Sequence, residues 1–150
     1  MKKAKIYLDM CCFNRPYDDQ TQQCIQFEAV AKLMIQSLIV SGQINFVWSY
    51  VLEFENSKNP FLEKRNTILA FKPFSSDTIH PDPAIETIAN TLQGKGLKAY
   101  DSLHVACAIY SNCDFFLTVD RKLLNKQCAE IKITDPVIFL NQWLKERSAT

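Results

Sequence analysis

The sequence predicts an α/β fold in which helices cover both faces of a parallel β-sheet. Short β-prone runs alternate with longer segments of helical periodicity along the chain. The 150 residues, 47% of them hydrophobic, suit one domain with one core, spanning residues 1–150. Right-handed crossovers bring the carboxyl ends of parallel strands to one edge of the sheet, and ligands bind at that edge in such folds. We therefore expect the functional site there.

The first half of the chain contains two β-prone runs, each followed by segments of helical character. The first run stops at Asp9, and we expect a loop from Met10 to Pro16. Apolar residues then recur at helical spacing until Ser41-Gly42. The expected elements are, in order, a strand at Lys5–Leu8, a helix at Thr21–Val40, a strand at Ile44–Ser49, and helices at Tyr50–Ser57 and Leu62–Phe71.

The second half begins with a Pro-rich loop at His80–Pro83 and ends with a capped helix. Thr134 or Asp135 is positioned to cap this last helix, and Pro136 suits its first turn. The expected elements are helices at Ala84–Leu92 and Ala99–Ser111, a strand at Phe115–Thr118, an edge strand at Ile131–Thr134 and a helix at Pro136–Leu144.

Composition limits the class of partner. Seventeen basic residues against sixteen acidic ones leave a net charge of +1, which excludes a strongly basic nucleic-acid coat and an acidic disordered tail. A polyanionic partner must therefore be held locally. No apolar run approaches the roughly 20 residues that span a bilayer, and no charged-then-apolar leader opens the sequence. We expect a soluble, cytoplasmic protein with no membrane partner.

The six cysteines do not suggest a disulfide framework. Cys11 and Cys12 are adjacent, and no secretion signal is present. A structural zinc site is disfavoured as well, because the two histidines, His80 and His104, have no matching CxxC-type pairs. We expect reduced thiols.

Acidic residues gather where the predicted strands end. Asp9 and Asp120 follow two strands within two positions, so a parallel sheet would deliver both to one edge. Glu53 and Glu55 lie on the helix after the second strand, about 200° apart, so only one of them can face the cleft. Asp101 lies near the start of its own helix and could reach the same place.

Converging carboxylates repel one another unless a cation joins them. Oxygen ligands suit Mg²⁺ or Mn²⁺, which keep several waters and can complete their shell with substrate phosphates. Such an ion can ionise a water and stabilise the oxyanions of an in-line phosphoryl displacement. Taken singly, Asp9 and Asp120 could equally be ordinary aspartates that start loops, Asp101 a plain helix cap, and the two glutamates part of a solvated face. Their joint placement favours a metal site.

Three motifs of the chain are similar to those of a known family. Tyr7-Leu8-Asp9, the block Asp101-Ser102-Leu103-His104-Val105-Ala106 and the run Phe116-Leu117-Thr118-Val119-Asp120 resemble the PIN-domain nucleases, which include VapC-type toxins of bacterial toxin–antitoxin pairs. The resemblance implies a three-layer α/β/α sandwich with a central parallel sheet of four to five strands. It also implies an acidic pocket that binds Mg²⁺ or Mn²⁺ and cleaves RNA or, in some branches, single-stranded DNA.

Carried over to this chain, the resemblance implies a ligand and catalytic set. Its members are Asp9, Glu55, Asp101 and Asp120. Thr118 resembles the family's hydroxyl residue beside the last aspartate, whereas Cys11 stands where many toxin members have Asn. The family further implies a homodimer and, for a toxin, an antitoxin protein as partner.

Several residues near the predicted edge could contact a substrate. Arg15 and Arg121 are our preferred phosphate contacts, and Asn14 joins them as a candidate substrate-binding residue. Lys95, Lys98 and Lys122 lie in similar loops. His104 is expected to be a packed side chain, and Asp114, which precedes its strand, is expected at the opposite edge. The strand aromatics Phe46, Trp48, Phe115 and Phe116 are expected in the core and not as stacking platforms for bases.

These residues favour a metal-dependent endoribonuclease over two alternatives. A phosphatase or phosphotransferase could use Asp9 as a nucleophile, but the second acid of such a site is replaced by Cys11. A catalytically inactive module of the same fold could bind nucleic acid or an antitoxin instead. All four acidic positions are filled, which favours an active site.

Overall fold

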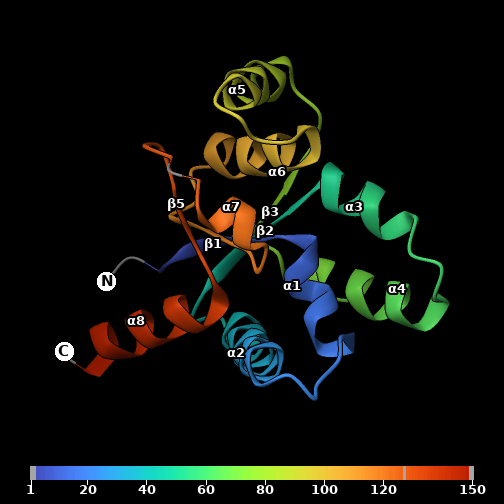
Figure 1. Ribbon diagram of the computed structural model, residues 1–150, viewed down its shortest axis with the longest axis vertical. Helices are drawn as coiled ribbons and strands as arrows, with labels where there is room; N and C mark the ends of the chain where they lie inside the picture. Colours follow the sequence, from blue (N-terminus) through green and yellow to red (C-terminus); the bar gives the residue numbers. More distant parts are fainter. Residues whose placement is uncertain (1–2, 127, 149–150) are drawn as a thin grey trace.

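The computed structural model describes residues 3–126 and 128–148 and confirms the expected α/β fold. A five-stranded, all-parallel sheet has the strand order β3-β2-β1-β4-β5. Helices lie on both of its faces, with α5 and α6 above the sheet and α2 and α8 below it in Figure 1. The strands are β1 (Lys5–Leu8), β2 (Asn45–Ser49), β3 (Asp77–Ile79), β4 (Phe115–Leu117) and β5 (Lys132–Thr134).

The helices agree with the expected periodic segments and add short ones. They are α1 (Met10–Asn14), α2 (Gln23–Val40), α3 (Tyr50–Ser57), α4 (Leu62–Leu69), α5 (Pro83–Gly94), α6 (Ala99–Tyr110), α7 (Arg121–Leu124) and α8 (Pro136–Ser148), with 3-10 turns at Arg15–Tyr17 and Lys72–Phe74. Asp135 Oδ1 accepts from the Ile138 N–H at 2.8 Å, so Asp135 is the residue that caps α8.

Three short elements differ from the expectation. The loop expected after β1 is helical from Met10, because the Asp9 carboxylate accepts from the Met10 N–H and starts α1. Strand β3 was not expected, since only Ile79 of its three residues is buried and it forms by pairing with β2. Helix α7 is a single turn that starts at the Asp120 cap.

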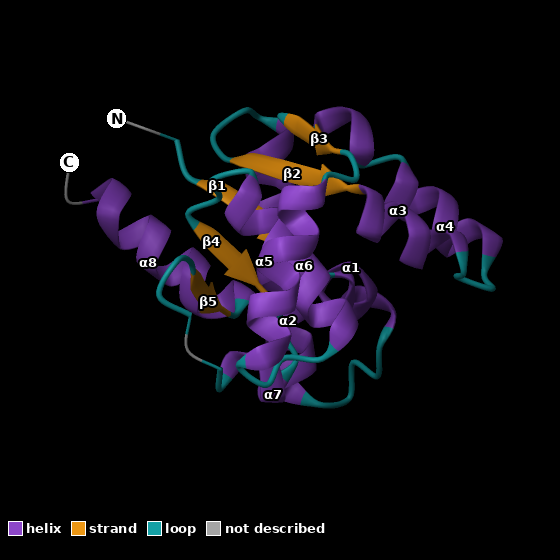
Figure 2. Cartoon of the chain, turned by 90° about the horizontal axis from the view of Figure 1, so that it is seen from above, coloured by secondary structure: helices purple, strands orange, loops and turns teal. Residues whose placement is uncertain are grey.

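The core lies between the sheet and the helices that cover it. Phe46, Trp48 and Phe116 are fully buried in their strands, as expected, and Phe115 is half-buried. Strand β5 lies at the edge of the sheet, also as expected. The strand arrows in Figure 2 point toward the side of the molecule that carries α1, α3 and α7. That side is the carboxyl edge.

Helix α2 has an unusual distribution of charge. Its two charged residues, Glu28 and Lys32, are buried, while Phe27, Val30 and Met34 are about half exposed. Burial lowers the pKa of Lys32 to about 8. Among the described helices, α2 alone has the length and apolar composition that could cross a membrane. This is weak evidence for a membrane span, since a core helix passes the same test, and the fold is compatible with a soluble protein.

Glu28 ties α2 to two segments that flank the carboxyl edge. Its two carboxylate oxygens accept from Arg15 Nε and from an Arg121 terminal nitrogen, each at 3.1 Å. Arg15 lies just after α1 and Arg121 begins α7, so one buried carboxylate joins helices from three parts of the chain.

We expect Glu28→Gln to lower the free energy of unfolding by about 1–3 kcal/mol, because two arginines lose a charged hydrogen-bond partner. Arg121 is 61% exposed and can turn to water, which favours the lower part of that range. Urea unfolding followed by circular dichroism measures the change. Glu63→Gln, on the exposed first turn of α4, is the control. Equal stability of the two variants would contradict the prediction.

Candidate functional site

The four predicted acids line one pocket at the carboxyl edge of the sheet. The pocket has a volume of about 470 Å³ and includes Asp9, Glu55, Asp101 and Asp120 in its wall. Asp9 follows β1, Asp120 follows β4 by three residues, and the other two lie on α3 and α6. We call this the acidic pocket.

Local structure explains how each acid reaches the acidic pocket. Asp9 and Asp120 are helix caps, with Asp120 Oδ1 accepting from the Lys122 N–H at 3.0 Å. Asp101 lies in the first turn of α6, where the helix dipole favours a carboxylate. The interpretation of Asp101 as a plain helix cap is therefore wrong, because Lys98 holds the N-cap position of α6. Asp9 and Asp120, the two aspartates that could simply have started loops, are the helix caps, and capping fixes them at the pocket.

The two glutamates of α3 point to different places. Glu55 lines the acidic pocket, whereas Glu53 Oε1 accepts from Lys72 Nζ at 2.6 Å outside it. This division follows from the roughly 200° between positions two residues apart on a helix.

Thr118 connects the two aspartates that follow β1 and β4. Its Oγ1 donates to Asp9 Oδ2 at 2.9 Å and accepts from the Asp120 N–H at 3.1 Å. Cys11 Sγ lies 3.4 Å from Asp9 Oδ2 and 3.3 Å from Thr118 Oγ1. The thiol of Cys11 and the hydroxyl of Thr118 therefore both contact Oδ2 of Asp9. These two contacts fix the orientation of the Asp9 carboxylate.

His104 connects the acidic pocket to the core. It is buried, as expected of a packed histidine, but it also lines the pocket and its Nε2 hydrogen bonds to Glu55 Oε1. Because a carboxylate only accepts, Nε2 carries the proton, and in the neutral ring Nδ1 accepts from the Tyr7 hydroxyl at 2.6 Å. That hydroxyl lies 2.6 Å from Ser49 Oγ. Burial raises the pKa of Tyr7 well above its usual value, so the phenol keeps its proton.

The acids influence one another electrostatically. Partial burial raises the pKa of Asp101, and the negative charges of Asp9 and Asp120 raise it further. His104 and Lys98 act in the opposite direction. Asp101 therefore lies close enough to the other two aspartates for their charges to repel its own.

The remaining candidate residues have different places. Asn14 lines the acidic pocket, and its buried Oδ1 has no hydrogen-bond partner among the described residues. Arg15 and Arg121 do not line it, because both pair with Glu28 and Arg15 also pairs with Asp18 at 3.0 Å. Asp114 lies at the opposite edge, as expected, and accepts from the Lys5 N–H at 2.9 Å.

The donor set of the acidic pocket fits Mg²⁺ or Mn²⁺ in chemistry. It consists of carboxylates plus the unpartnered amide oxygen of Asn14, all hard oxygen donors. Within residues 3–126 and 128–148, no three His, Cys, Asp or Glu side chains are gathered closely enough to form a ready-made metal cluster. Mg²⁺ needs only one or two carboxylates, since waters and substrate phosphates complete its shell.

A second pocket adjoins the acidic pocket and is basic. It has a volume of about 340 Å³, shares Asp101 with the acidic pocket and is lined by Lys98, Lys122 and Lys126. Gly96 approaches Lys126 closely: its φ is +100°, and a β-carbon there would lie 3.2 Å from Lys126 Nζ. We call this the lysine pocket. Lys98 and Lys122 were expected near the edge, whereas Lys126 was not.

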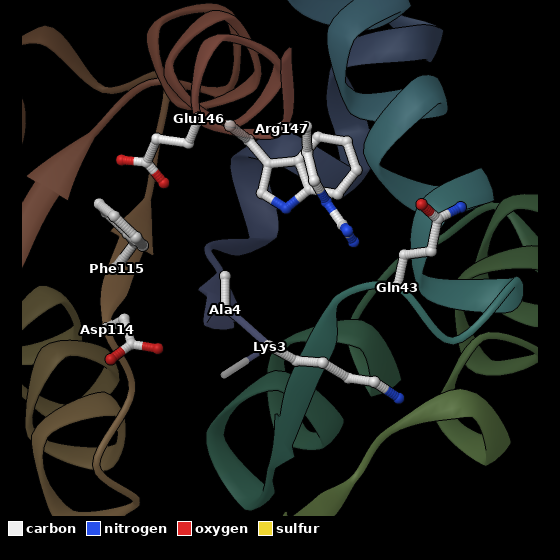
Figure 3. Close-up of a pocket in the computed structure, with 8 residues that line it drawn as sticks. Lys3, Ala4, Gln43, Asp114, Phe115, Glu146 and Arg147 are labelled. Atoms are coloured by element: carbon white, nitrogen blue, oxygen red, sulfur yellow. The ribbon is translucent and has the colours of Figure 1, made fainter. Parts of the chain in front are cut away.

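A further pocket lies at the amino edge of the sheet, away from the acids. It has a volume of about 270 Å³ and is bordered by side chains of both signs, including Lys3, Asp114, Glu146 and Arg147 (Figure 3). Its place before the strands and its mixed charge distinguish it from the carboxyl-edge site.

Several residues of the acidic pocket were not predicted to contribute to it, among them His104, Phe54 and Tyr100. His104 lies one helical turn after Asp101, a spacing that places both on one side of α6. Phe54 and Tyr100 line the acidic pocket and directly precede Glu55 and Asp101. The sequence pattern that could have identified Phe54 and Tyr100 is an aromatic residue directly before each of the two acids on helices.

Comparison with known proteins adds no assignment to this geometry. The chain matches no protein-family model and has no significant match to a curated protein.

Proposed function

We propose that this protein is a metal-dependent nuclease that hydrolyses phosphodiester bonds, with RNA as the expected substrate. The observation that carries the proposal is the meeting of Asp9, Glu55, Asp101 and Asp120 in one pocket. They come from four distant parts of the chain and lie at the edge where α/β folds bind ligands. The charges of Asp9 and Asp120 raise the pKa of Asp101, so the acids repel one another across the pocket, and a bound cation would relieve that repulsion.

The residues around the acidic pocket have separable tasks in this proposal. Asp9, Asp101 and Asp120, with Glu55, would hold Mg²⁺ or Mn²⁺, which supplies Lewis acidity to activate water and neutralise phosphoryl oxygens. Thr118 fixes the orientation of Asp9, and His104 fixes that of Glu55. The lysine pocket offers charge to phosphates on one side of the site.

The phosphatase alternative is less well supported. Asp9 is only 7% exposed, and its oxygens already accept from the Met10 N–H and the Thr118 hydroxyl. Both oxygens of Asp9 are therefore engaged, and Cys11 stands where a phosphatase would need a second acid to protonate the leaving group. We expect the enzyme to act in the cytoplasm, where a toxin role would add an antitoxin protein as partner.

The first prediction from this proposal concerns the acids themselves. Purified protein should cleave a labelled RNA panel with Mn²⁺ or Mg²⁺, and EDTA or Asp9→Asn should abolish cleavage. Glu55→Gln should slow cleavage on the order of a hundredfold or more, since it removes a carboxylate that would hold the metal ion. Glu53→Gln, two residues away on the same helix, is the matched control and should retain activity.

Two outcomes would contradict this prediction. Cleavage that survives EDTA and Asp120→Asn would exclude the proposed ligand set. Tight binding of RNA without cleavage under either metal would instead support the inactive binding module. Running RNA and DNA side by side decides between the two substrates.

The second prediction concerns the lysine pocket. Changing Lys98, Lys122 and Lys126 together to Gln should weaken RNA binding and reduce the slope of log K against log salt. The reduction should be about 0.7 for each phosphate of a single strand that the variant no longer binds. Anisotropy titrations over a range of salt concentrations measure that slope. Lys145→Gln, exposed on α8, is the control. An unchanged slope in the triple variant would show that the lysines do not touch phosphate.

The exposed face of α2 offers a place for the expected homodimer. The exposed side chains of α2 carry no charge, because Glu28 and Lys32 both turn inward. Phe27, Val30 and Met34 border a shallow hollow that α8 completes. A twofold axis places a surface against itself, and an uncharged surface meets no like-charge repulsion there. We propose that a second copy of the chain packs on this face.

The third prediction follows from that arrangement. Val30→Glu should convert a dimer into a monomer, since it would place two carboxylates against each other across the axis. Light scattering coupled to size-exclusion chromatography measures the mass. Gln93→Glu, exposed on α5, adds the same charge elsewhere and should leave the dimer intact. A wild-type protein that is monomeric would refute the dimer.

A further inference from the structure

Two exposed aromatic rings stand at the rim of the acidic pocket. Phe54 on α3 is 46% exposed and Tyr100 on α6 is 50% exposed, and both line the pocket. Each directly precedes an acid of the site, Glu55 or Asp101. Neither ring belongs to the hydrophobic core, so packing inside the protein does not explain their place.

The geometry of the pair suits a flat apolar ligand. The ring planes of Phe54 and Tyr100 are only 14° from parallel, and their centroids are 6.4 Å apart. Offset, parallel aromatic pairs of this kind are favourable contacts, and they present ring faces and edges in one common orientation. A third planar group can continue the same stack.

A positive charge accompanies the rings. Lys58 Nζ lies 4.6 Å from the centroid of Phe54, and Lys58 lines the acidic pocket too. Within the part of the chain that the structure describes, no carboxylate lies within ion-pair distance of Lys58. Its ammonium group is therefore available to an anionic ligand that reaches the rings.

We propose that Phe54 and Tyr100 form a stacking subsite for an unpaired nucleobase, next to the phosphodiester held in the acidic pocket. Aromatic rings combined with basic side chains are how proteins hold single strands without reading sequence, because every base has a π-face. Lys58 would contact the backbone phosphate of the stacked nucleotide. This inference rests on the proposed nuclease function and adds a binding site and a requirement for an unpaired base to it.

A protein partner is the competing occupant of the rim, since Phe and Tyr also serve as interface anchors. The acidic pocket argues against it. A protein laid over the rings would also cover four carboxylates and remove them from water, which is costly without matching cations. A nucleic-acid strand leaves room for metal ions and water between its phosphates and the acids.

The test measures stacking directly. A single-stranded RNA containing one 2-aminopurine is titrated with protein in Ca²⁺, which can occupy an oxygen site while cleavage is suppressed. Quenching of the 2-aminopurine on binding to wild-type protein is expected, together with a loss of affinity on the order of tenfold in Tyr100→Ala and in Phe54→Ala. Tyr100→Phe and Phe54→Trp, which keep a ring, should restore quenching and affinity.

Matched controls separate stacking from general damage. Tyr110→Ala removes an exposed tyrosine from the other end of α6, and Phe74→Ala removes an exposed phenylalanine from the 3-10 turn at Lys72–Phe74. Both should bind as wild type. An abasic site in place of the 2-aminopurine should weaken wild-type binding and leave the Tyr100→Ala variant unaffected.

The outcomes distinguish this inference from the nuclease function. Metal-dependent cleavage together with equal affinity of the alanine variants, or with duplex bound as tightly as single strand, overturns the stacking subsite and leaves the function standing. Ring-dependent quenching without cleavage in Mn²⁺ supports the subsite and refutes the nuclease. Self-association that disappears in Tyr100→Ala, with no binding of RNA, overturns the inference in favour of a protein contact.

Discussion

Repulsion between carboxylates at the carboxyl edge of the sheet is the constraint on which the rest of the site depends. The parallel topology brings Asp9, Asp101 and Asp120 into one pocket, and all three positions carry an acidic residue. Protein donors relieve part of the repulsion. The Met10 N–H and the Thr118 hydroxyl bind Asp9, and the Lys122 N–H binds Asp120. Asp101 lacks comparable donors among the described residues, and partial burial together with the charges of Asp9 and Asp120 raises its pKa.

A chain of buried hydrogen bonds fixes the position of Glu55 at this edge of the sheet. Ser49, Tyr7 and His104 form consecutive hydrogen bonds through the core and end on Glu55. Burying three polar side chains costs free energy unless each is satisfied, and a satisfied network fixes rotamers more tightly than apolar packing does. Tyr7 also stacks on Phe116, 5.3 Å between centroids, which couples the chain to β4 and so to the residues that precede Asp120. The position of Glu55 is thus determined from the centre of the sheet.

The local sequence pattern was sufficient to predict long or strongly β-prone elements, such as α2 and β4. It was also sufficient for the acids that follow strands, because a parallel topology alone brings those acids to one edge of the sheet. Strand β3 could not be predicted in this way, because its pairing with β2 and not its composition makes it a strand. The bond between Glu28 and Arg121 joins positions 93 residues apart, and the stacking of Phe54 on Tyr100 requires α3 and α6 to lie side by side. Such contacts arise only through tertiary packing, which no local pattern records.

The net charge of +1 hides an uneven distribution of charged residues at the candidate site. The acidic pocket and the lysine pocket share Asp101, so a region lined by carboxylates directly adjoins a region lined by lysines. Cations bound at the acids would reverse the sign of the first pocket and join it to the second. A phosphate backbone would then meet positive potential along both pockets and at Lys58, although the whole molecule is almost neutral. If the attraction depends on bound cations in this way, only the metal-loaded protein would bind a polyanion strongly. A nuclease of this kind would then need no strongly basic surface.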